Sequence, residues 1–262
     1  MLLAEFGPSL QFRQIMEALK EVLVFAQLRI DKTGLKLTSI GCSSSCLAHV
    51  VIPAQACVSY HWRKDDILLC RVKVHDWVRA MKDSRKKYQN IIGMVLEDKQ
   101  FIFKFYSQTT HETTLPNTTL SFTALKPSTC VIKTLPSKDN VSTLEMPSSE
   151  LKRICIIASL LGKHSLEITL TPDGIDLVAI GTRSKYPLHI APCNGTDQDP
   201  VLITMMHKVI RQQFPLRFLN FFNKASNLSD RVIGGFAPDR PCYVEYKMGE
   251  GSITYLLEPF VN

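Results

Sequence analysis

Two cations, Arg217 and Lys224, stand seven residues apart in the aromatic-rich segment "FPLRFLNFFNKASNL" (214–228). In an α-helix this spacing places both side chains on one side, two turns apart and beside the apolar face. Such a helix can pack its aromatic residues against a neighbouring element and leave two positive charges in water. We therefore ask whether other segments pair cations with an apolar stripe in the same way.

Three further segments have this pattern, at 8–25, 74–89 and 147–162. The first carries Phe12, Ile15 and Leu19 as part of its stripe, with cations seven residues apart beside it. Exposed helix faces often carry Lys and Arg, so one basic helix by itself decides little. Four of them predict a shared basic surface suited to a phosphate backbone, without reading of bases. Its candidate residues are Arg13, Lys20, Arg79, Lys82, Lys86, Lys152, Arg153, Arg217 and Lys224.

Other chemistries find little support in the sequence. The eight cysteines form no Cys-x-x-Cys pair and have no histidine at zinc-ligand spacing, which predicts reduced, buried thiols and no metal site. "GCSSSC" (41–46) is not a Gly-x-Ser-x-Gly elbow, and "GKHS" (162–165) lacks the upstream glycine of a phosphate-binding loop. We therefore expect no cofactor and no catalytic site, and an enzyme is the weakest hypothesis.

Length and composition indicate an ordinary globular chain with a basic balance. Its 262 residues suffice for two modest domains, and 45% of them are apolar. Neither a membrane-spanning apolar run nor a basic leader segment is evident, so an intracellular protein without a membrane partner is expected. The net charge of +7 is weak support for an anionic partner.

An internal repeat organises the chain. "LRIDKTGLKLTSIG" (28–41) matches "ITLTPDGIDLVAIG" (168–181) at a constant offset of 140 residues, with Gly34 aligned to Gly174. Alternating apolar residues flank a polar turn with glycine in both copies, which predicts two β-hairpins. A helix-like segment precedes each hairpin. The repeat therefore predicts two similar domains in tandem.

The segment between the copies, "LKPSTCVIKTLPSKDN" (125–140), contains two prolines and shows no sustained periodicity. These features are typical of an extended linker. The predicted boundaries are an N-terminal domain at 1–124, a connector at 125–140 and a C-terminal domain at 141–262.

The chain resembles the sliding clamp family. The resemblance is carried by "EALKEVL", "GLKLTSI", "LEMPSSELKRIC", "DGIDLVAIG", "FPLRFLNFFNKA" and "PCYVEYKM", which occur in order along the whole chain. Residues 42–125 and 183–212 match the family poorly. The resemblance implies an α+β fold with two tandem clamp-type domains, in which helices cover one face of antiparallel sheets and an interdomain connector joins the halves.

The same resemblance implies a function. A clamp of this family is a homotrimeric ring around double-stranded DNA that serves as a DNA polymerase processivity factor in DNA replication and repair, and it is not an enzyme. Its partners would be DNA polymerase, other proteins with clamp-binding motifs and a clamp loader. The expected location is the nucleus or a viral replication site. The ring would close through edge strands near 118–125 and 175–182.

The resemblance also places a partner-peptide groove beneath the connector. Its residues would be Ile40, Leu47, Leu135, Pro136, Pro241, Leu256 and Pro259. Two departures concern the basic surface, because Ile156 replaces a basic residue and Leu160 a polar one. The net charge of +7 also contrasts with the acidic exterior of the family. A divergent or virus-encoded clamp, or a specialised paralogue, accounts for that charge.

Two alternatives remain open at this point. The chain can be a clamp-fold processivity factor that works through its basic face as a monomer or dimer, without a closed ring. It can also be a clamp-like scaffold for transcription or checkpoint factors. The basic helices argue against the scaffold, and oligomeric state separates the ring from the monomer or dimer.

Overall fold

The chain folds into two compact units in the computed structural model. The first comprises residues 1–42, 48–133 and 248–253, and the second comprises residues 43–47, 134–247 and 254–262. The structure describes residues 2–7, 9–40, 45–62, 67–82, 90–97, 100–107, 120–123, 126, 141–161, 163–181, 184–190, 201–204, 209–238 and 240–260. The predicted boundaries at 124/125 and 140/141 lie outside these residues and stay predictions.

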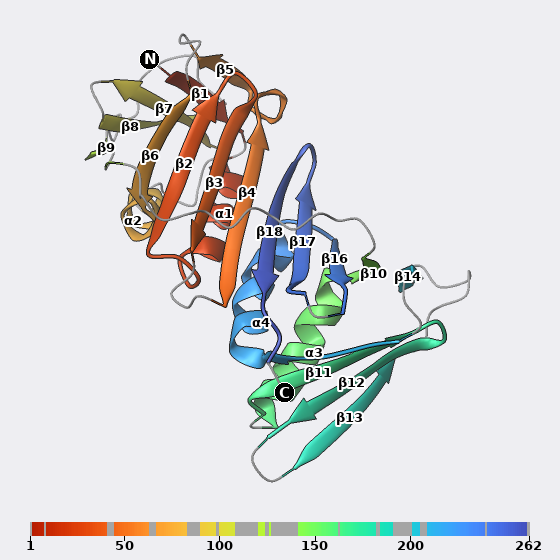
Figure 1. Ribbon diagram of the computed structural model, residues 1–262. Helices are drawn as coiled ribbons and strands as arrows, with labels where there is room; N and C mark the ends of the chain where they lie inside the picture. The colour runs from red at the N-terminus through yellow and green to blue at the C-terminus, as the bar shows by residue number, and fades with distance from the viewer. Residues whose placement is uncertain are drawn as a thin grey trace. The chain divides into compact units, whose positions relative to one another are not determined.

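The first unit contains two runs of antiparallel strands (Figure 1). One follows the order β5-β1-β7-β8-β9, formed by Ser59–Trp62, Leu2–Phe6, Asn90–Glu97, Gln100–Ser107 and Leu120–Thr123. The other follows the order β4-β3-β2-β6, formed by Cys46–Pro53, Gly34–Ile40, Phe25–Asp31 and Leu68–Lys73. A 3-10 turn, η1 (Ala54–Ala56), follows β4.

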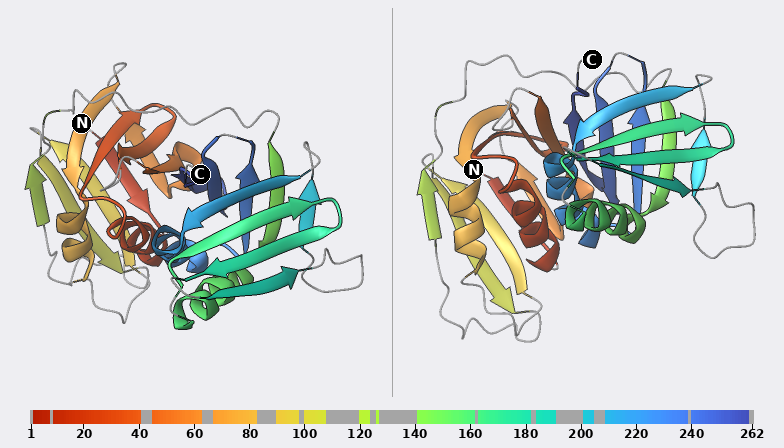
Figure 2. Two further views of the ribbon diagram at one scale, coloured as in Figure 1. Left: turned by 60° about the horizontal axis from the view of Figure 1, so that its bottom comes forward. Right: turned by 90° about the horizontal axis from the view of Figure 1, so that it is seen from below.

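Two helices, α1 (Ser9–Leu19) and α2 (Val74–Lys82), lie side by side in the first unit (Figure 2). Aromatic rings pack the apolar faces of both helices against the strands. Phe6 of β1 stacks on Phe12 of α1 at 4.4 Å between ring centroids, and Phe12 lies 6.2 Å from Trp77 of α2. Trp77 in turn meets Phe101 of β8 edge-on at 5.4 Å. These contacts fix which side of each helix faces solvent.

The second unit repeats this plan. One run has the order β14-β10-β16-β17-β18, formed by Leu202–Thr204, Ser142–Pro147, Arg231–Phe236, Cys242–Met248 and Gly251–Leu257. A four-stranded sheet has the order β13-β12-β11-β15, formed by Lys185–Ile190, Gly174–Ile180, Ser165–Thr171 and Ile210–Pro215. The helices α3 (Ser148–Leu160) and α4 (Leu216–Phe222) pack against each other and against these strands. Together the units confirm the α+β fold of the two-domain clamp type.

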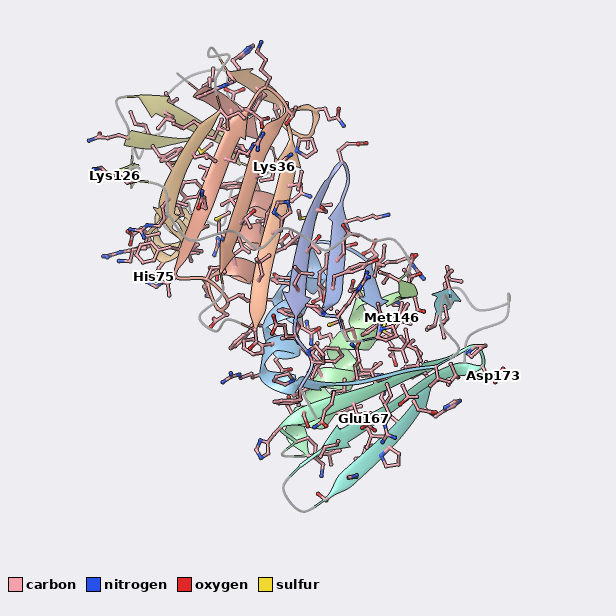
Figure 3. All side chains as sticks on the ribbon, in the orientation of Figure 1. Lys36, His75, Lys126, Met146, Glu167 and Asp173 are labelled. Carbon is pink, nitrogen blue, oxygen red and sulfur yellow. The ribbon has the colours of Figure 1, made fainter. Side chains whose placement is uncertain are left out.

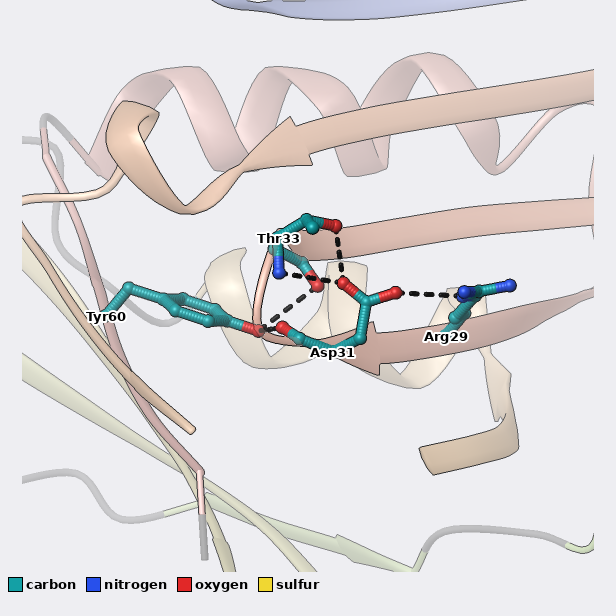
Figure 4. A network of polar contacts seen from close by, with 5 residues as sticks. Arg29, Asp31, Thr33 and Tyr60 are labelled. Carbon is teal, nitrogen blue, oxygen red and sulfur yellow. Dashed lines mark hydrogen bonds and ion pairs between the residues drawn. The ribbon is translucent and has the colours of Figure 1, made fainter. Parts of the chain in front are cut away.

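Both predicted hairpins are present, as β2–β3 and β11–β12. Each has a two-residue turn, because Asp31 pairs with Gly34 in the first and Thr171 pairs with Gly174 in the second. Polar contacts hold the first turn together (Figure 4). The Thr33 backbone N–H donates to Asp31 at 2.8 Å, and the Tyr60 hydroxyl donates to the carbonyl oxygens of Asp31 and Gly34 at 2.6 and 3.1 Å. Hydrogen bonds from Thr33, and then from Arg29, hold the pKa of Asp31 below its ordinary value.

Some predicted elements end elsewhere than the sequence indicated. The helix expected within 8–25 stops at Leu19, and Phe25 already belongs to β2. The helix at 74–89 is described as far as Lys82. The helix within 214–228 changes at Asn223 into a 3-10 helix, η2 (Asn223–Asn227), so Lys224 lies beyond the α-helix that carries Arg217. The argument from seven-residue spacing on one α-helix is therefore wrong for this pair.

One predicted edge strand is also wrong. The expected segment at 175–182 coincides with β12, which is paired on both sides, with β11 and with β13. Among the described strands, β13 and β15 form the two edges of this sheet, and β5 and β9 form those of the five-stranded sheet. The sequence hid β13 because its exposed residues and Pro187 weaken the alternating pattern of a strand.

The described parts of the chain contain no helix that is long and apolar enough to cross a membrane. Their five described cysteines are free, and Cys46, Cys70, Cys155 and Cys242 are buried. Burial raises the pKa of Cys70 to about 12 and that of Cys155 to about 11, so both stay protonated thiols at neutral pH.

The first turn predicts a specific sensitivity at Gly34. This residue has φ of 134°, and a Cβ there would collide with backbone atoms of Ile52, Pro53 and Ala54. We expect Gly34→Ala to lower the free energy of unfolding by more than about 2 kcal/mol in urea titrations, since strain and collision add. Gly249→Ala is the matched control, because Gly249 also has positive φ but no atom within 4 Å of the added Cβ. If Gly34→Ala and Gly249→Ala lower the free energy of unfolding equally, the close approach of backbone atoms to Gly34 is not the cause of the loss.

Candidate nucleic-acid interface

The candidate DNA-binding cations of the second unit lie on the exposed sides of α3, α4 and η2. In α4, Leu216, Phe218, Leu219 and Phe222 are buried, whereas Arg217 is exposed. The Arg217 guanidinium lies 4.6 Å from the centroid of the Phe218 ring, a cation–π contact that holds the charge close to the helix. Lys224 of η2 is exposed as well. Although the two cations belong to different helix types, both remain available to an anion.

The α3 helix offers less positive charge than its sequence indicates. Lys152 and Arg153 are both exposed. The Arg153 side chain, however, donates to both carboxylate oxygens of Glu150 at 2.8 and 2.5 Å. This fork holds the pKa of Glu150 below its ordinary value and raises that of Arg153, so the pair is ionised on both sides. Half of the predicted positive charge of α3 therefore already has a counterion.

An apolar patch continues the exposed side of α3. Ile156 is 47% exposed, Leu160 81% and Leu161 42%. Asn220 of α4 donates to the Ser159 hydroxyl at 2.9 Å, which links the two helices beside this patch. The two departures from the family pattern, Ile156 and Leu160, are thus solvent-exposed and are not absorbed into the core.

The described candidate cations of the first unit lie on or next to α1 and α2, which contact each other. Arg13 is half-buried on α1, and Arg79 is exposed on α2. Lys20 follows α1 and pairs with Glu17 at 2.5 Å. Lys82 ends α2 but its side chain is outside the described residues, as is Lys86 altogether. The structure therefore brings Arg13, Lys20 and Arg79 onto neighbouring elements and leaves their contact with DNA a prediction.

Two counterions, Glu17 and Glu150, are features that the charge pattern alone did not reveal. Each stands three residues before its cation, a spacing at which helical side chains meet. That signal was present in the sequence. Such surface pairs stabilise a helix by only about 0.2–0.5 kcal/mol. A phosphate group can therefore replace Glu17 or Glu150 as the partner of the cation at a small cost in free energy.

The predicted partner groove is described only in part. Leu47 and Leu256, 5% and 7% exposed, lie in one apolar cluster with Tyr243, against which Val141 and Ile233 pack. Pro241 and Pro259 are half-buried. The side chain of Ile40 and the whole of Leu135 and Pro136 lie outside the described residues. Two of the seven predicted residues are thus brought together, and Tyr243 is a member of the cluster that the sequence did not single out.

No cluster of three or more His, Cys, Asp or Glu side chains with the geometry of a metal site occurs in the described parts of the chain. In the "GKHS" segment, the His164 backbone N–H donates to the Ile180 carbonyl oxygen at 2.9 Å, and Ser165 begins β11. The described part of the segment therefore leads into a strand, whereas a phosphate-binding loop leads into a helix.

Comparison with known proteins agrees with this architecture. Residues 134–260 match the family model described as "Proliferating cell nuclear antigen, C-terminal domain". The whole chain is 28% identical to "Proliferating cell nuclear antigen 2" of Drosophila melanogaster, over 263 aligned residues that cover 100% of this chain and 98% of the relative. The two units of antiparallel sheets with paired helices, together with these matches, support a likeness to the sliding clamps.

Among these proteins, the chain is similar to proliferating cell nuclear antigen (PCNA). At the level of the family, this likeness supports a sliding clamp and processivity factor, and PCNA-family clamps are non-enzymatic scaffolds. The predicted resemblance is confirmed. The individual DNA-binding and groove residues stay predictions.

The apolar patch on α3 generates a gain-of-function prediction. We expect Ile156→Arg to strengthen binding to double-stranded DNA and to steepen the log–log salt dependence by about 0.9, the effect of one additional phosphate contact. Fluorescence anisotropy over a salt series measures both quantities. The control is Asp173→Asn, which changes the net charge equally but lies in the β11–β12 turn, where Figure 3 labels Asp173 at the tip of the hairpin. An equal gain in DNA affinity in both variants would show that the affinity depends on net charge and not on the position of the charge on α3.

Proposed function

We propose that this chain forms a closed homotrimeric ring around double-stranded DNA and tethers DNA polymerase and other partners through a peptide groove. The observation that carries the proposal is the same arrangement in both units, in which paired helices bury one face against sheets and expose cations on the other. A surface of this kind binds phosphates without sequence preference, as a sliding contact requires.

The proposed ring surface is uneven. In the second unit, Arg217, Lys152 and Lys224 are exposed cations, whereas Arg153 is paired and Ile156 and Leu160 contribute no charge. We therefore assign the stronger phosphate contacts of this unit to α4 and η2. In the first unit, Arg13, Lys20, Arg79, Lys82 and Lys86 serve the same purpose.

Head-to-tail pairing of edge strands closes the proposed ring. Because β12 is interior, we assign the contact to β13 of one protomer and β9 of the next. The described side chains of β13 are exposed or half-buried, including Tyr186 at 43%, which leaves them available for such a contact. The monomeric or dimeric basic-face factor remains the second candidate, because the cations alone support DNA binding without closure.

Nuclear location and the absence of catalysis belong to the same proposal. They rest on the likeness to a nuclear antigen of an animal and on the scaffold role of the family. The comparisons give no support to a viral replication site. The clamp loader and the particular polymerase are proposed as partners at the level of class only.

The edge strand predicts how the ring can be broken. Tyr186→Asp should turn a trimer into monomers that still fold, since a charge at a buried interface costs several kcal/mol while an exposed strand tolerates it. Light scattering at several concentrations gives the mass, and thermal unfolding reports the fold. Lys247→Asp on β17, which is exposed but away from the edge, should remain trimeric. Wild-type protein that stays monomeric at high concentration would contradict the proposed ring.

Encirclement predicts topological retention on DNA. Protein loaded on nicked circular DNA should survive a high-salt wash and leave after one restriction cut, because a closed ring exits only at an end. Replacing Arg217 and Lys224 with Ala should reduce the salt slope of free binding by about 1.8, for two phosphate contacts. Retention on the circle should change much less.

The control for that experiment replaces Arg240 and Lys247 with Ala, because both are exposed cations outside the helices. It removes the same charge and should leave the salt slope nearly unchanged. Equal loss of wild-type protein from circular and linear DNA would favour the basic-face factor over the ring.

A further inference from the structure

The first unit turns one face of the run β4-β3-β2-β6 away from its core. Along β2, buried side chains alternate with exposed or half-buried ones, which places Phe25, Gln27 and Arg29 on this outer face. The helix α1 lies on the other side of the strands, behind them in the view of Figure 1. The outer face is therefore a surface separate from the helices and their cations.

Cations from three strands meet on this outer face. Side chains of direct cross-strand partners project to the same side of a sheet. Arg71 of β6 is opposite Gln27, and Lys36 of β3 is opposite Arg29. Lys73, two residues along β6 from Arg71, points to the same side. The register thus brings the following cations together: Arg29, Lys36, Arg71 and Lys73.

Two of these cations already have a carboxylate partner. Arg29 Nε donates to Asp31 Oδ2 at 2.9 Å. Lys73 Nζ lies 3.6 Å from Asp76 Oδ1, in the first turn of α2. These pairs satisfy Arg29 and Lys73 within the chain, and they show that carboxylates can reach the cations of this face.

The other two cations, Lys36 and Arg71, form no ion pair with a carboxylate in the described parts of the chain. Arg71 Nε is buried and has no hydrogen-bond partner among the described residues, so part of its donor capacity is unused. The charge of Lys36 acts on His49 of β4, since burial and then Lys36 lower the pKa of His49. The face therefore has a surplus of positive charge, which favours an anionic partner.

Apolar side chains lie between these cations. Leu69 of β6 is opposite Arg29 and is 42% exposed. Phe25 is 36% exposed, and the Arg71 guanidinium lies over its ring at 4.8 Å from the centroid. That contact occupies one side of the ring, so a nucleic-acid base cannot stack there. Two cations without a counterion also neutralise few phosphates, whereas a protein segment can supply carboxylates and apolar side chains together.

We propose that the outer face of β6, β2 and β3 docks an acidic segment of a partner protein, whose carboxylates pair with Lys36 and Arg71 while its apolar side chains cover Phe25 and Leu69. Lys36 and Arg71 have β2 between them and are offset by one pair of residues, so their Cα atoms are roughly 12 Å apart. Carboxylates four residues apart on an extended segment are about 13 Å apart, which matches this separation. The proposal does not depend on the ring or on the DNA-facing helices.

Synthetic peptides test the proposed surface. The probe is a fluorescein-labelled peptide of three Glu-Ser-Leu-Ser repeats, which places glutamate and leucine alternately on one side of an extended chain. Wild-type protein should bind it with a Kd below about 1 mM at low salt, and more weakly as salt screens the charges. Peptides with glutamine in place of glutamate, or serine in place of leucine, should bind about fivefold more weakly in fluorescence anisotropy.

A double variant locates the binding site. Lys36→Gln combined with Arg71→Gln should weaken binding of the probe about fivefold, because two ion pairs are lost. The matched control is Lys163→Gln combined with Arg211→Gln, which removes the same charge from the second unit and should leave the affinity unchanged. Thermal unfolding reports the fold. If the double variant does not fold, Lys36→Gln alone should weaken binding about twofold, and Lys36→Arg should bind as wild type does.

The histidine beside Lys36 gives a readout in the unmutated protein. A carboxylate bound to Lys36 offsets its positive charge, so the pKa of His49 should rise when the glutamate peptide binds. The glutamine peptide should leave the pKa of His49 where it is. Proton NMR titration measures both, and the spectrum of His49→Gln assigns the signal.

Three results would overturn the proposal. The first is wild-type protein that does not bind the probe, and the second is an equal loss of affinity in the control variant, which would indicate an effect of net charge alone. The third concerns single-stranded oligothymidylate. If the Lys36 and Arg71 variant loses affinity for oligothymidylate but not for the peptide, the occupant of this face is a nucleic acid and not an acidic protein segment.

Discussion

The need to bury one face of each helix is the constraint on which the rest of this structure depends. Phe6, Phe12, Trp77 and Phe101 connect both helices of the first unit to its strands. In the second unit Phe222 of α4 stacks on Tyr255 of β18 at 4.4 Å. Aromatic contacts of this kind fix a helix in rotation as well as in position. Each helix therefore has one solvent face, and Arg79, Lys152, Arg153 and Arg217 are exposed on such faces.

The helices of the second unit use that solvent face differently. The chain keeps a basic surface on α4 and η2, but α3 combines a neutralised arginine with an apolar patch. Phosphate attraction is long-ranged and non-specific, so a clamp can lose cations on one helix while others hold the backbone. The net charge of +7 contrasts with the acidic exterior that the resemblance to sliding clamps implies.

The strand β17 shows how one element can serve two purposes. Its inward residues complete the apolar core of the second unit, where Tyr246 is fully buried, and its outward residue Tyr243 packs in a second cluster with Leu47 and Leu256. Because the alternation is fixed by the pleat, a change on the outer face need not disturb the inner one. Tyr243 and Gly235 are directly paired on that outer face, so a substitution at either position changes the packing of the buried Tyr243 ring.

The sequence by itself determined the repeated hairpins, the positions of the four helices and the residues that carry their charge, because these are local properties of periodicity and turn chemistry. It also carried the family resemblance. Only the tertiary structure decided that β13 and not β12 is an edge, that α4 gives way to a 3-10 helix before Lys224, and that Tyr243 lies on Gly235. Each of these depends on which segments distant in sequence become neighbours, and no local pattern encodes strand order or the packing of a side chain across strands.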